Sequence, residues 1–320
     1  MIPTTLAIMM LAGAGATETA PSQPVSPRGP IGTCDTEVLV GGSIFRGGGM
    51  INDGWDGEGA NPTTLYFHIE NTSGDLGGGQ RAAIINALAA WASVVRIDFV
   101  EIGVPNISRS LDFRFATGDH CAVESGECGD PDCPFDGSGG VIAHAAFPPG
   151  GNGTCGPASS ESRSGNVHFD DGDFFETDTG SPTDGYSMTL ITAHEVGHAI
   201  GLVHDTGGGG PHIMRPTFGW GSVMQNPSAS DAAHLQQGYA TGVGSVTTFE
   251  GNGIWVNASY MFTELGLPGD PFNTIPEALN ALPPFNTGVT IHLIGGAYPP
   301  ITISQPCTIT AEFNAATIGQ

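Results

Sequence analysis

The sequence predicts a mixed α+β domain over residues 58–242, followed by a smaller region of alternating strands over residues 245–320. Segments with strand-like and helical spacing follow one another in the order β-α-β-β-β-β-α-loop-α, which is typical of mixed domains, either α/β or α+β. A chain of 320 residues has room for one good-sized core and something smaller. After Gly242 the pattern changes, because Gly-Gly and Pro-Pro pairs separate the remaining strands.

The first half of the domain shows clear periodicity. Residues 65–70, 97–102 and 111–116 alternate apolar and polar side chains, as half-buried strands do. Between the first two strands we expect a helix, because apolar residues recur there at helical spacing: Ile84, Ile85, Leu88, Trp91, Ala92 and Val95.

The second half begins with an irregular stretch, residues 118–178, which contains only two short strands, at 141–146 and 167–169. A loop of this length inside a domain usually needs metals or disulfides to hold it. Two helices then follow. Ser187 can cap the first, which runs to about Gly201. The second begins near Ser228 or Ser230.

The region after the domain contains fewer predicted helices and strands. We expect a short helix at residues 272–282 and strands at 289–293 and 301–310. This pattern is typical of the start of a repeat array. Since a single repeat cannot bury its own apolar face, we expect the region to be marginally stable.

The charge balance excludes some partners. The formal net charge is −24, from 8 Lys and Arg against 32 Asp and Glu. Phosphate backbones and anionic lipid headgroups would repel such a chain, so we expect no nucleic-acid partner. Excess carboxylates suit calcium binding, or solubility in a salty medium, and composition alone does not choose between the two.

The N-terminus has the character of an export signal. The apolar run at residues 6–16 is too short to span a bilayer but suits a secretory signal peptide at 1–20, with Ala14-Gly15-Ala16 as a cleavage site. Residues 21–57 would then be a linker or arm, and a disordered arm from the start is the alternative. No other stretch is long enough to cross a membrane, so we expect a secreted protein.

The six cysteines are consistent with an exported protein. Four of them fall in one 35-residue window and predict a local disulfide staple with three possible pairings: Cys121, Cys128, Cys133 and Cys155. Cys34 and Cys307 either pair with each other or stay free.

The segment His-Glu-Val-Gly-His-Ala-Ile-Gly-Leu-Val-His, residues 194–204, carries the strongest functional signal. His194 and His198 are four apart, so on a helix both imidazoles project from the same side and can share one metal ion. Gly201 lets the chain leave the helix in a left-handed turn, which returns His204 as a third ligand. Three protein ligands leave one position open, as a catalytic zinc site requires.

Glu195 supplies the base that such a site needs. It lies beside the first ligand and can reach a water molecule on the metal without itself becoming a ligand. The zinc lowers the pKa of that water and polarises a peptide carbonyl, and Glu195 takes the proton as general base. For one histidine alone, an ordinary hydrogen-bonded side chain would be the better interpretation; three at this spacing predict a zinc-dependent endopeptidase acting on proteins or peptides.

At this motif the chain resembles the metzincin metallopeptidases and, within them, the matrixins, over most of residues 60–242. The resemblance implies a twisted, mostly parallel five-stranded sheet with three helices, and a monomeric catalytic domain. It also implies a methionine turn beneath the metal. Met214, in Ile-Met-Arg-Pro, fits this turn, and Met224 competes for it. A methionine that merely fills core space is the alternative.

The irregular stretch resembles the matrixins as well. Their second, structural zinc is implied here at His120, His144 and His168, with Asp130 or Asp132 as the fourth ligand. The alternative is that disulfides have replaced this site. The neighbouring calcium site of the family is implied at Asp136, Asp170 and Asp173, and a solvated acidic loop is the alternative.

Two features depart from the family pattern. Matrixins are usually held latent by a pro-segment cysteine in a Pro-Arg-Cys-Gly motif, which is missing here, so Cys34 is the remaining candidate for that role. The region 245–320 resembles the opening of a right-handed parallel β-helix, as in bacterial surface proteins. A surface-binding β-helix protein with a non-catalytic metallopeptidase-like domain is therefore an alternative function, and an amidase acting on non-protein amides is another.

The substrate is expected to bind as a strand. The segment at 141–146 should form a sheet edge beside the metal, where an extended peptide adds by β-augmentation. Recognition of the main chain would then contribute more than any one side-chain pocket.

Overall fold

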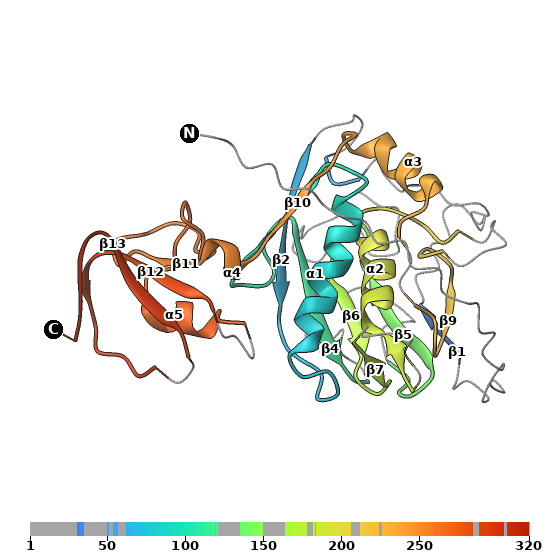
Figure 1. Cartoon of the computed structure of the whole chain (residues 1–320), viewed down its shortest axis with the longest axis horizontal. Helices are drawn as coiled ribbons and strands as arrows, with labels where there is room; N and C mark the ends of the chain where they lie inside the picture. Colours follow the sequence, from blue (N-terminus) through green and yellow to red (C-terminus); the bar gives the residue numbers. More distant parts are fainter. Residues whose placement is uncertain are drawn as a thin grey trace, which may run out of the picture.

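The computed structural model of the chain describes residues 31–34, 50, 54–56, 62–118, 120, 135–149, 164–177, 182, 184–205, 212–223, 226–283, 288–303 and 306–319. The predicted signal peptide, most of the arm, the four clustered cysteines, Asp130, Asp132 and Met224 lie outside these residues. Figure 1 shows a larger lobe, built on one sheet, and a smaller C-terminal lobe beside it. No described helix is long and apolar enough to cross a lipid bilayer.

The larger lobe contains the mixed sheet that the sequence predicts. Its five central strands, in spatial order, are β3 (Ile97–Glu101), β2 (Thr63–Ile69), β4 (Ser110–Ala116), β6 (Val167–Asp170) and β5 (Gly140–Ala145). Neighbouring strands are parallel except β5, which runs antiparallel to β6. The predicted α+β class and the mostly parallel sheet are therefore confirmed.

The sheet is wider than predicted, with eight strands instead of five. β10 (Ser245–Thr247) pairs parallel to β3 at one edge. At the other edge β1 (Ile31–Cys34) pairs parallel to β5, and β9 (Thr217–Gly219) pairs antiparallel to β1. Strands of three or four residues are too short to show alternation, which explains why the sequence assigned two of these segments to the arm and the tail.

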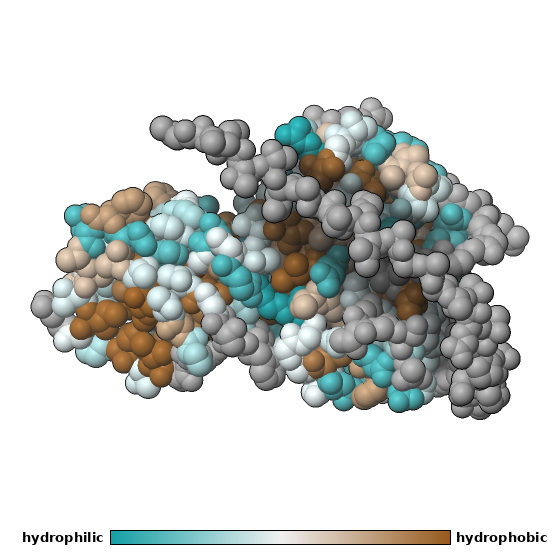
Figure 2. Space-filling view, in the orientation of Figure 1, coloured by the Kyte–Doolittle hydropathy of each residue, from teal (hydrophilic) through white to brown (hydrophobic). Residues whose placement is uncertain are grey.

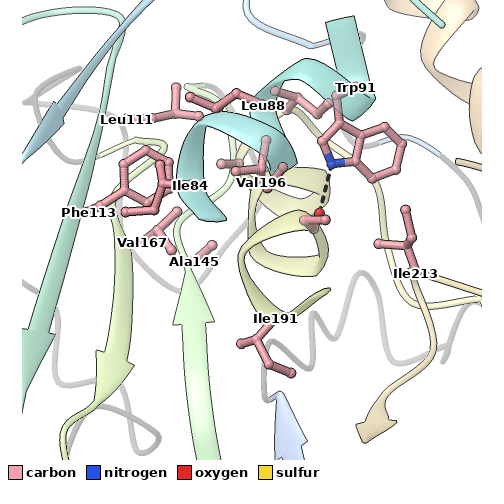
Figure 3. Close-up of a cluster of buried hydrophobic side chains, with 14 of the residues drawn as sticks. Ile84, Leu88, Trp91, Leu111, Phe113, Ala145, Val167, Ile191, Val196 and Ile213 are labelled. Carbon is pink, nitrogen blue, oxygen red and sulfur yellow. Dashed lines mark hydrogen bonds between the residues drawn. The ribbon is translucent and has the colours of Figure 1, made fainter. Parts of the chain in front are cut away.

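Two helices pack against each other over the sheet and form the core with it. In Figure 3, Ile84 of α1 (Gly79–Ala92) lies beside Phe113 of β4, and Val196 of α2 (Met188–Ala199) lies between this pair and Trp91 of α1. All of these side chains are buried. The Trp91 indole N–H donates a hydrogen bond of 2.7 Å to the carbonyl of Ala193. This bond fixes α2 relative to α1.

The two other helices predicted for the larger lobe are present, and the structure identifies the N-cap of each. The Ser187 hydroxyl accepts a hydrogen bond of 3.1 Å from the amide of Leu190, so it caps α2. α3 (Ala229–Gly238) begins after Ser228, which forms a reciprocal capping box with Asp231. Ser228 rather than Ser230 is therefore the cap. A two-stranded sheet of β7 (Phe175–Glu176) and β8 (Tyr186–Ser187) leads into α2.

The C-terminal lobe is a three-stranded parallel sheet with its own core. Its strands are β11 (Ile254–Val256), β12 (Thr290–Tyr298) and β13 (Thr308–Ile318). Its helices are α4 (Phe249–Asn252) and α5 (Ile275–Asn280). Buried apolar residues from all of these elements except β13 form one cluster, and Ile309 and Ala316 of β13 pack against it from partly buried positions. Figure 2 shows hydrophobic residues on the visible face of this lobe.

The strand predictions for this lobe need correction. β12 continues through Gly295 and Gly296 to Tyr298, because it stays paired with β13 across a bulge at this point. β13 begins at Thr308 and not at residue 301. The alternation at 301–303 therefore does not mark a strand, and β11 was missed because it is only three residues long. The short helix is confirmed as α5, and Cys307 is free, not paired with Cys34.

The two lobes are joined by charge as well as by the β10 strand. Glu101 of β3 is buried, and it accepts a hydrogen bond of 2.8 Å from the amide of Phe249 at the start of α4. Arg81 of α1 forms ion pairs with Glu101 and with Glu250 of α4. Burying a carboxylate costs free energy unless it is paired. The partners of Glu101 are Arg81 in the larger lobe and the Phe249 amide in the C-terminal lobe, so its burial depends on both lobes.

Candidate functional site

α2 and the turn after it bring the three predicted histidines together. His194 and His198 lie one turn apart on α2 and are fully buried. Gly201 has a φ of 110°, and this left-handed turn carries the chain back so that His204 faces the helix. The Nε2 atom of His194 lies 3.0 Å from Nε2 of His198 and 3.1 Å from Nε2 of His204. The expected role of Gly201 is thus visible in its backbone.

Backbone carbonyls orient two of these rings. Nδ1 of His194 lies 2.7 Å from the carbonyl of Ile213, and Nδ1 of His198 lies 2.7 Å from the carbonyl of Leu202. A carbonyl oxygen only accepts, so each Nδ1 carries the proton and donates. In a neutral ring the Nε2 atom then has a free lone pair, as a metal ligand requires.

The donor set fits a zinc ion. Two Nε2 lone pairs at 3.0 Å repel each other unless a cation or a proton lies between them. A tetrahedral ion with Zn–N bonds of about 2.0–2.1 Å separates its ligand nitrogens by roughly 3.3 Å, close to the spacing seen here. The lowered pKa values of the three histidines favour a metal ion over a shared proton between these nitrogens. Burial lowers the pKa of His194 well below its usual value, that of His198 to about 3 and that of His204 to about 4.

Met214 packs against the back of this helix. It is buried, and a Cβ on Gly197 would overlap its sulfur and approach the Trp91 ring. The Met214 carbonyl accepts a hydrogen bond of 2.7 Å from the amide of Asp205, next to His204. The preceding residue, Ile213, holds His194. The segment 213–214 therefore supports the histidine cluster from two sides, and Met214 stays the predicted methionine turn.

Glu195 completes the constellation. It lies on the same turn of α2, between the two helical histidines in sequence, and is fully buried. Its role as general base for the cluster stays a prediction.

A second histidine cluster lies between β5, β6 and the chain before β5. His144 and His168 are directly opposite each other in the antiparallel β5–β6 pair. Nε2 of His144 lies 3.0 Å from Nδ1 of His168 and 3.0 Å from Nε2 of His120. His120 stacks on Phe135 with ring centroids 4.3 Å apart. Both histidine clusters have the grouping of a metal site, whereas the predicted fourth ligand here, Asp130 or Asp132, lies outside the described residues.

The three predicted calcium ligands also converge. Asp170 and Asp173 are buried, and each accepts one hydrogen bond from a backbone amide of the 136–140 loop, Gly137 and Gly139 respectively. The Asp173 Oδ2 atom is buried with no hydrogen-bond partner among the described residues. Burial raises the pKa of Asp173 to about 6, with a further contribution from the charges of Asp170 and Asp136. This crowding of carboxylates would be relieved by a cation.

The expected substrate edge is already paired. Residues 31–33 of β1 lie between residues 140–141 of β5 and residues 217–219 of β9. Phe218, the partner of Gly32, packs edge-on against the His194 ring at 5.1 Å between centroids. Met50, further along the same arm, forms an antiparallel bridge with Leu202 between the second and third histidines. The described arm residues 31–33 and Met50 therefore pair with segments that border the histidine cluster.

Sequence reasoning missed the supporting groups of this site. The carbonyls of Leu202 and Ile213 leave no signal in a sequence, because every residue has one. The arm could have been found through Trp55. This residue is buried, and its indole N–H donates a hydrogen bond of 2.9 Å to the carbonyl of Ala199. A tryptophan in a Gly-rich linker is a signal of docking.

Comparison with known proteins agrees with the geometry. The family model of the matrixins matches residues 59–240. Karilysin from Tannerella forsythia is 34% identical over 147 residues, which cover 45% of this chain and 26% of that protein. Matrix metalloproteinase-18 from Xenopus laevis is 33% identical over 156 residues, covering 48% and 27%. Human matrix metalloproteinase-26 is 31% identical over 182 residues, covering 56% and 59%. The matches to the first two relatives thus span about a quarter of each relative's length.

The contact between Gly197 and Met214 gives a structural prediction. Gly197→Ala should lower the melting temperature by several degrees and reduce zinc retention, because the new methyl group would displace Met214 and Trp91 behind the histidines. Gly251→Ala is the matched control, since Gly251 lies in a helix and no heavy atom is within 4 Å of the place that its methyl group would take. Thermal unfolding and bound zinc would be measured for both. Equal behaviour of the two variants would contradict this role of the turn.

Proposed function

The chain belongs to the matrixin family of zinc metalloendopeptidases, and on this premise we propose that it is a secreted enzyme that hydrolyses peptide bonds of extended protein substrates. His194, His198 and His204 would hold the catalytic zinc, and Glu195 would be the general base. The observation that carries the proposal is the trio of Nε2 atoms, adjacent ones 3.0–3.1 Å apart, with a buried carboxylate on the same helix turn.

Each residue has a separate task in this proposal. When bound, zinc supplies a Lewis acid that polarises a carbonyl and makes water more acidic. The Ile213 and Leu202 carbonyls keep the rings of His194 and His198 in the tautomer that binds metal. Glu195 accepts a proton from the attacking water and can pass it to the leaving amine. Burial keeps other water away from this proton transfer.

The remaining metal assignments follow the same reasoning. We propose that His120, His144 and His168 hold a structural zinc, and that Asp136, Asp170 and Asp173 contribute to a calcium site. Both would stabilise the long segment between β4 and α2. We further propose that the catalytic domain acts as a monomer, and that a longer C-terminal region, where present, ties the enzyme to a surface. An intact Glu195 argues against the non-catalytic scaffold.

We also propose that β1 keeps the enzyme latent. An extended substrate needs the free edge of β5, and β1 pairs with that edge. Its position beside β9 and the histidines supports a blocking role, whichever residue faces the metal. Cys34, the last residue of β1, is the candidate for a thiol ligand of the zinc.

The general-base assignment predicts a specific loss. Glu195→Gln should retain zinc but hydrolyse a quenched fluorescent peptide at least about 100-fold more slowly than the parent, because the amide cannot take a proton. Both proteins would be compared after β1 has been removed, at equal zinc content. A variant within about ten-fold of the parent would refute the role of Glu195. If neither protein cleaves despite bound zinc, the scaffold alternative is favoured.

The blocking role of β1 predicts a gain. Thr33→Pro should raise peptide hydrolysis by about ten-fold or more, because proline removes a ladder amide from a strand paired on both sides. Thr33→Ala is the control and should change little. Cys34→Ala tests the thiol separately from the strand. This variant should gain activity only if the Cys34 thiol binds the zinc. Mass spectrometry must show that residues 31–34 are still attached. Unchanged rates in Thr33→Pro would contradict the proposal.

The calcium proposal predicts a pH dependence. Without a cation, the folded-state pKa of Asp173 is raised to about 6, so its contribution to stability is present below about pH 4 and is lost as the pH rises through 6. Added calcium should therefore raise the melting temperature more at about pH 7.5 than at about pH 5, with zinc held constant. Asp173→Asn should lose most of this difference. A calcium effect that is equal at both pH values would count against the site.

A further inference from the structure

The outer face of the C-terminal sheet carries an aromatic patch, defined by Trp255, His292, Thr310, Glu312 and Phe313. Trp255, His292 and Thr310 are in register across β11, β12 and β13. Their strand neighbours Ile254, Val256, Ile291 and Leu293 are buried, so the patch lies on the opposite face of the sheet. The Trp255 and His292 rings stack at 4.5 Å between centroids, 18° from parallel.

Several contacts hold this patch in one geometry. Nδ1 of His292 lies 2.8 Å from Oε1 of Glu312, and the Thr310 hydroxyl lies 3.2 Å from both groups. The Trp255 indole N–H donates to the carbonyl of Asn252 at 3.0 Å. Gly253 lies so close to the His292 ring that a Cβ there would overlap it. The rings are thus fixed before any ligand arrives, which lowers the entropy lost on binding.

Phe313 is held in place by an unusual backbone. Its φ is 65°, a left-handed value that an aromatic residue rarely adopts. It lies in a bulge, where β12 advances from Ile294 to Gly296 while β13 advances from Glu312 to Ala316. The residue is 81% exposed, and its ring centroid lies 6.4 Å from that of Trp255. Strain that keeps a large apolar side chain in water, beside a rigid aromatic stack, points to a binding role.

The charge around the patch selects the ligand. The C-terminal region has no Lys or Arg over residues 245–320, whereas its acidic residues are Glu250, Glu264, Asp270, Glu277 and Glu312. Among the described residues, both hydrogen bonds to the Glu312 side chain use Oε1, which leaves Oε2 for a ligand. A guanidinium group stacks on aromatic rings and binds a carboxylate oxygen at the same time. Arg215 shows the first of these contacts in this protein, since its guanidinium carbon lies 5.0 Å from the Phe218 ring centroid.

We propose that the aromatic patch binds an arginine side chain of a partner polypeptide. The guanidinium plane stacks on Phe313 and the edge of Trp255, and its N–H groups donate to Oε2 of Glu312. This makes the C-terminal lobe a docking module for basic segments. The proposal does not depend on peptidase activity, since the patch belongs to the C-terminal lobe and shares no residue with the histidine clusters.

A peptide of six D-arginines is the probe, because a peptidase does not readily hydrolyse it. Binding to the full chain would be measured by calorimetry at physiological salt or above, where exposed long-range charge effects are screened. Phe313→Gly should weaken binding about five-fold, the loss of one exposed cation–π contact. It should also leave the melting temperature equal or higher, because glycine adopts this φ freely. Glu312→Gln should weaken binding to a similar degree.

Phe262→Gly is the matched control, because Phe262 is 79% exposed in the same lobe but outside the patch. It should bind the peptide as the parent does. The proposal fails if Phe313→Gly and Phe262→Gly bind equally well, since binding would then be diffuse charge attraction. It also fails if maltohexaose, a neutral sugar, binds in a Phe313-dependent manner while the arginine peptide does not. A hexa-D-lysine peptide should bind more weakly than the arginine peptide.

Discussion

The fixed position of α2 is the constraint on which the rest of the molecule depends. Three of the polar side chains on this helix, His194, Glu195 and His198, are fully buried, although burying them stabilises nothing by itself. The helix is held from behind by the Trp91 hydrogen bond to Ala193 and by the close fit of Met214 at Gly197. A small shift of α2 would move the His194 ring away from the Ile213 carbonyl and disturb the approach of His198 to the Leu202 carbonyl. Core packing is therefore what aligns the site.

The two edges of the main sheet are used in different ways. At one edge, β10 continues the chain into the C-terminal lobe, where the Phe249 amide donates to the buried Glu101 carboxylate and Glu250 pairs with Arg81. Because a buried carboxylate of the sheet is satisfied in part by the other lobe, the C-terminal lobe is part of the folded unit rather than a tethered addition. At the other edge, β5 borders the histidine cluster, and among the described residues the short strand β1, followed by the three residues of β9, covers it. If a substrate strand pairs with β5, as proposed, β1 has to leave this edge first.

Much of this arrangement could be predicted from the sequence, because it depends on the spacing of residues that are close together in the chain. Histidines four apart on a helix, Gly201 at a left-handed turn and the Ser187 cap all depend on residues close in the chain. What escaped prediction depends on distant partners. The short strand β1 forms only because β5 and β9 lie on either side of it, and the carbonyls of Leu202 and Ile213 act only where the fold brings them. The alternation at 301–303 predicted a strand wrongly, since spacing alone does not supply a pairing partner.

The role of each acidic residue depends on where it lies in the structure. A net charge of −24 allowed either cation binding or solubility, and composition could not separate them. In the structure, carboxylates play different parts according to burial. Asp173 is buried beside two other acids and needs a counter-charge, whereas Glu101 is buried and already has one in Arg81. Glu312 is half-exposed and shares one oxygen with His292. Because the chain has only 8 Lys and Arg, both the calcium proposal for Asp173 and the arginine proposal for Glu312 supply a positive charge from outside the chain.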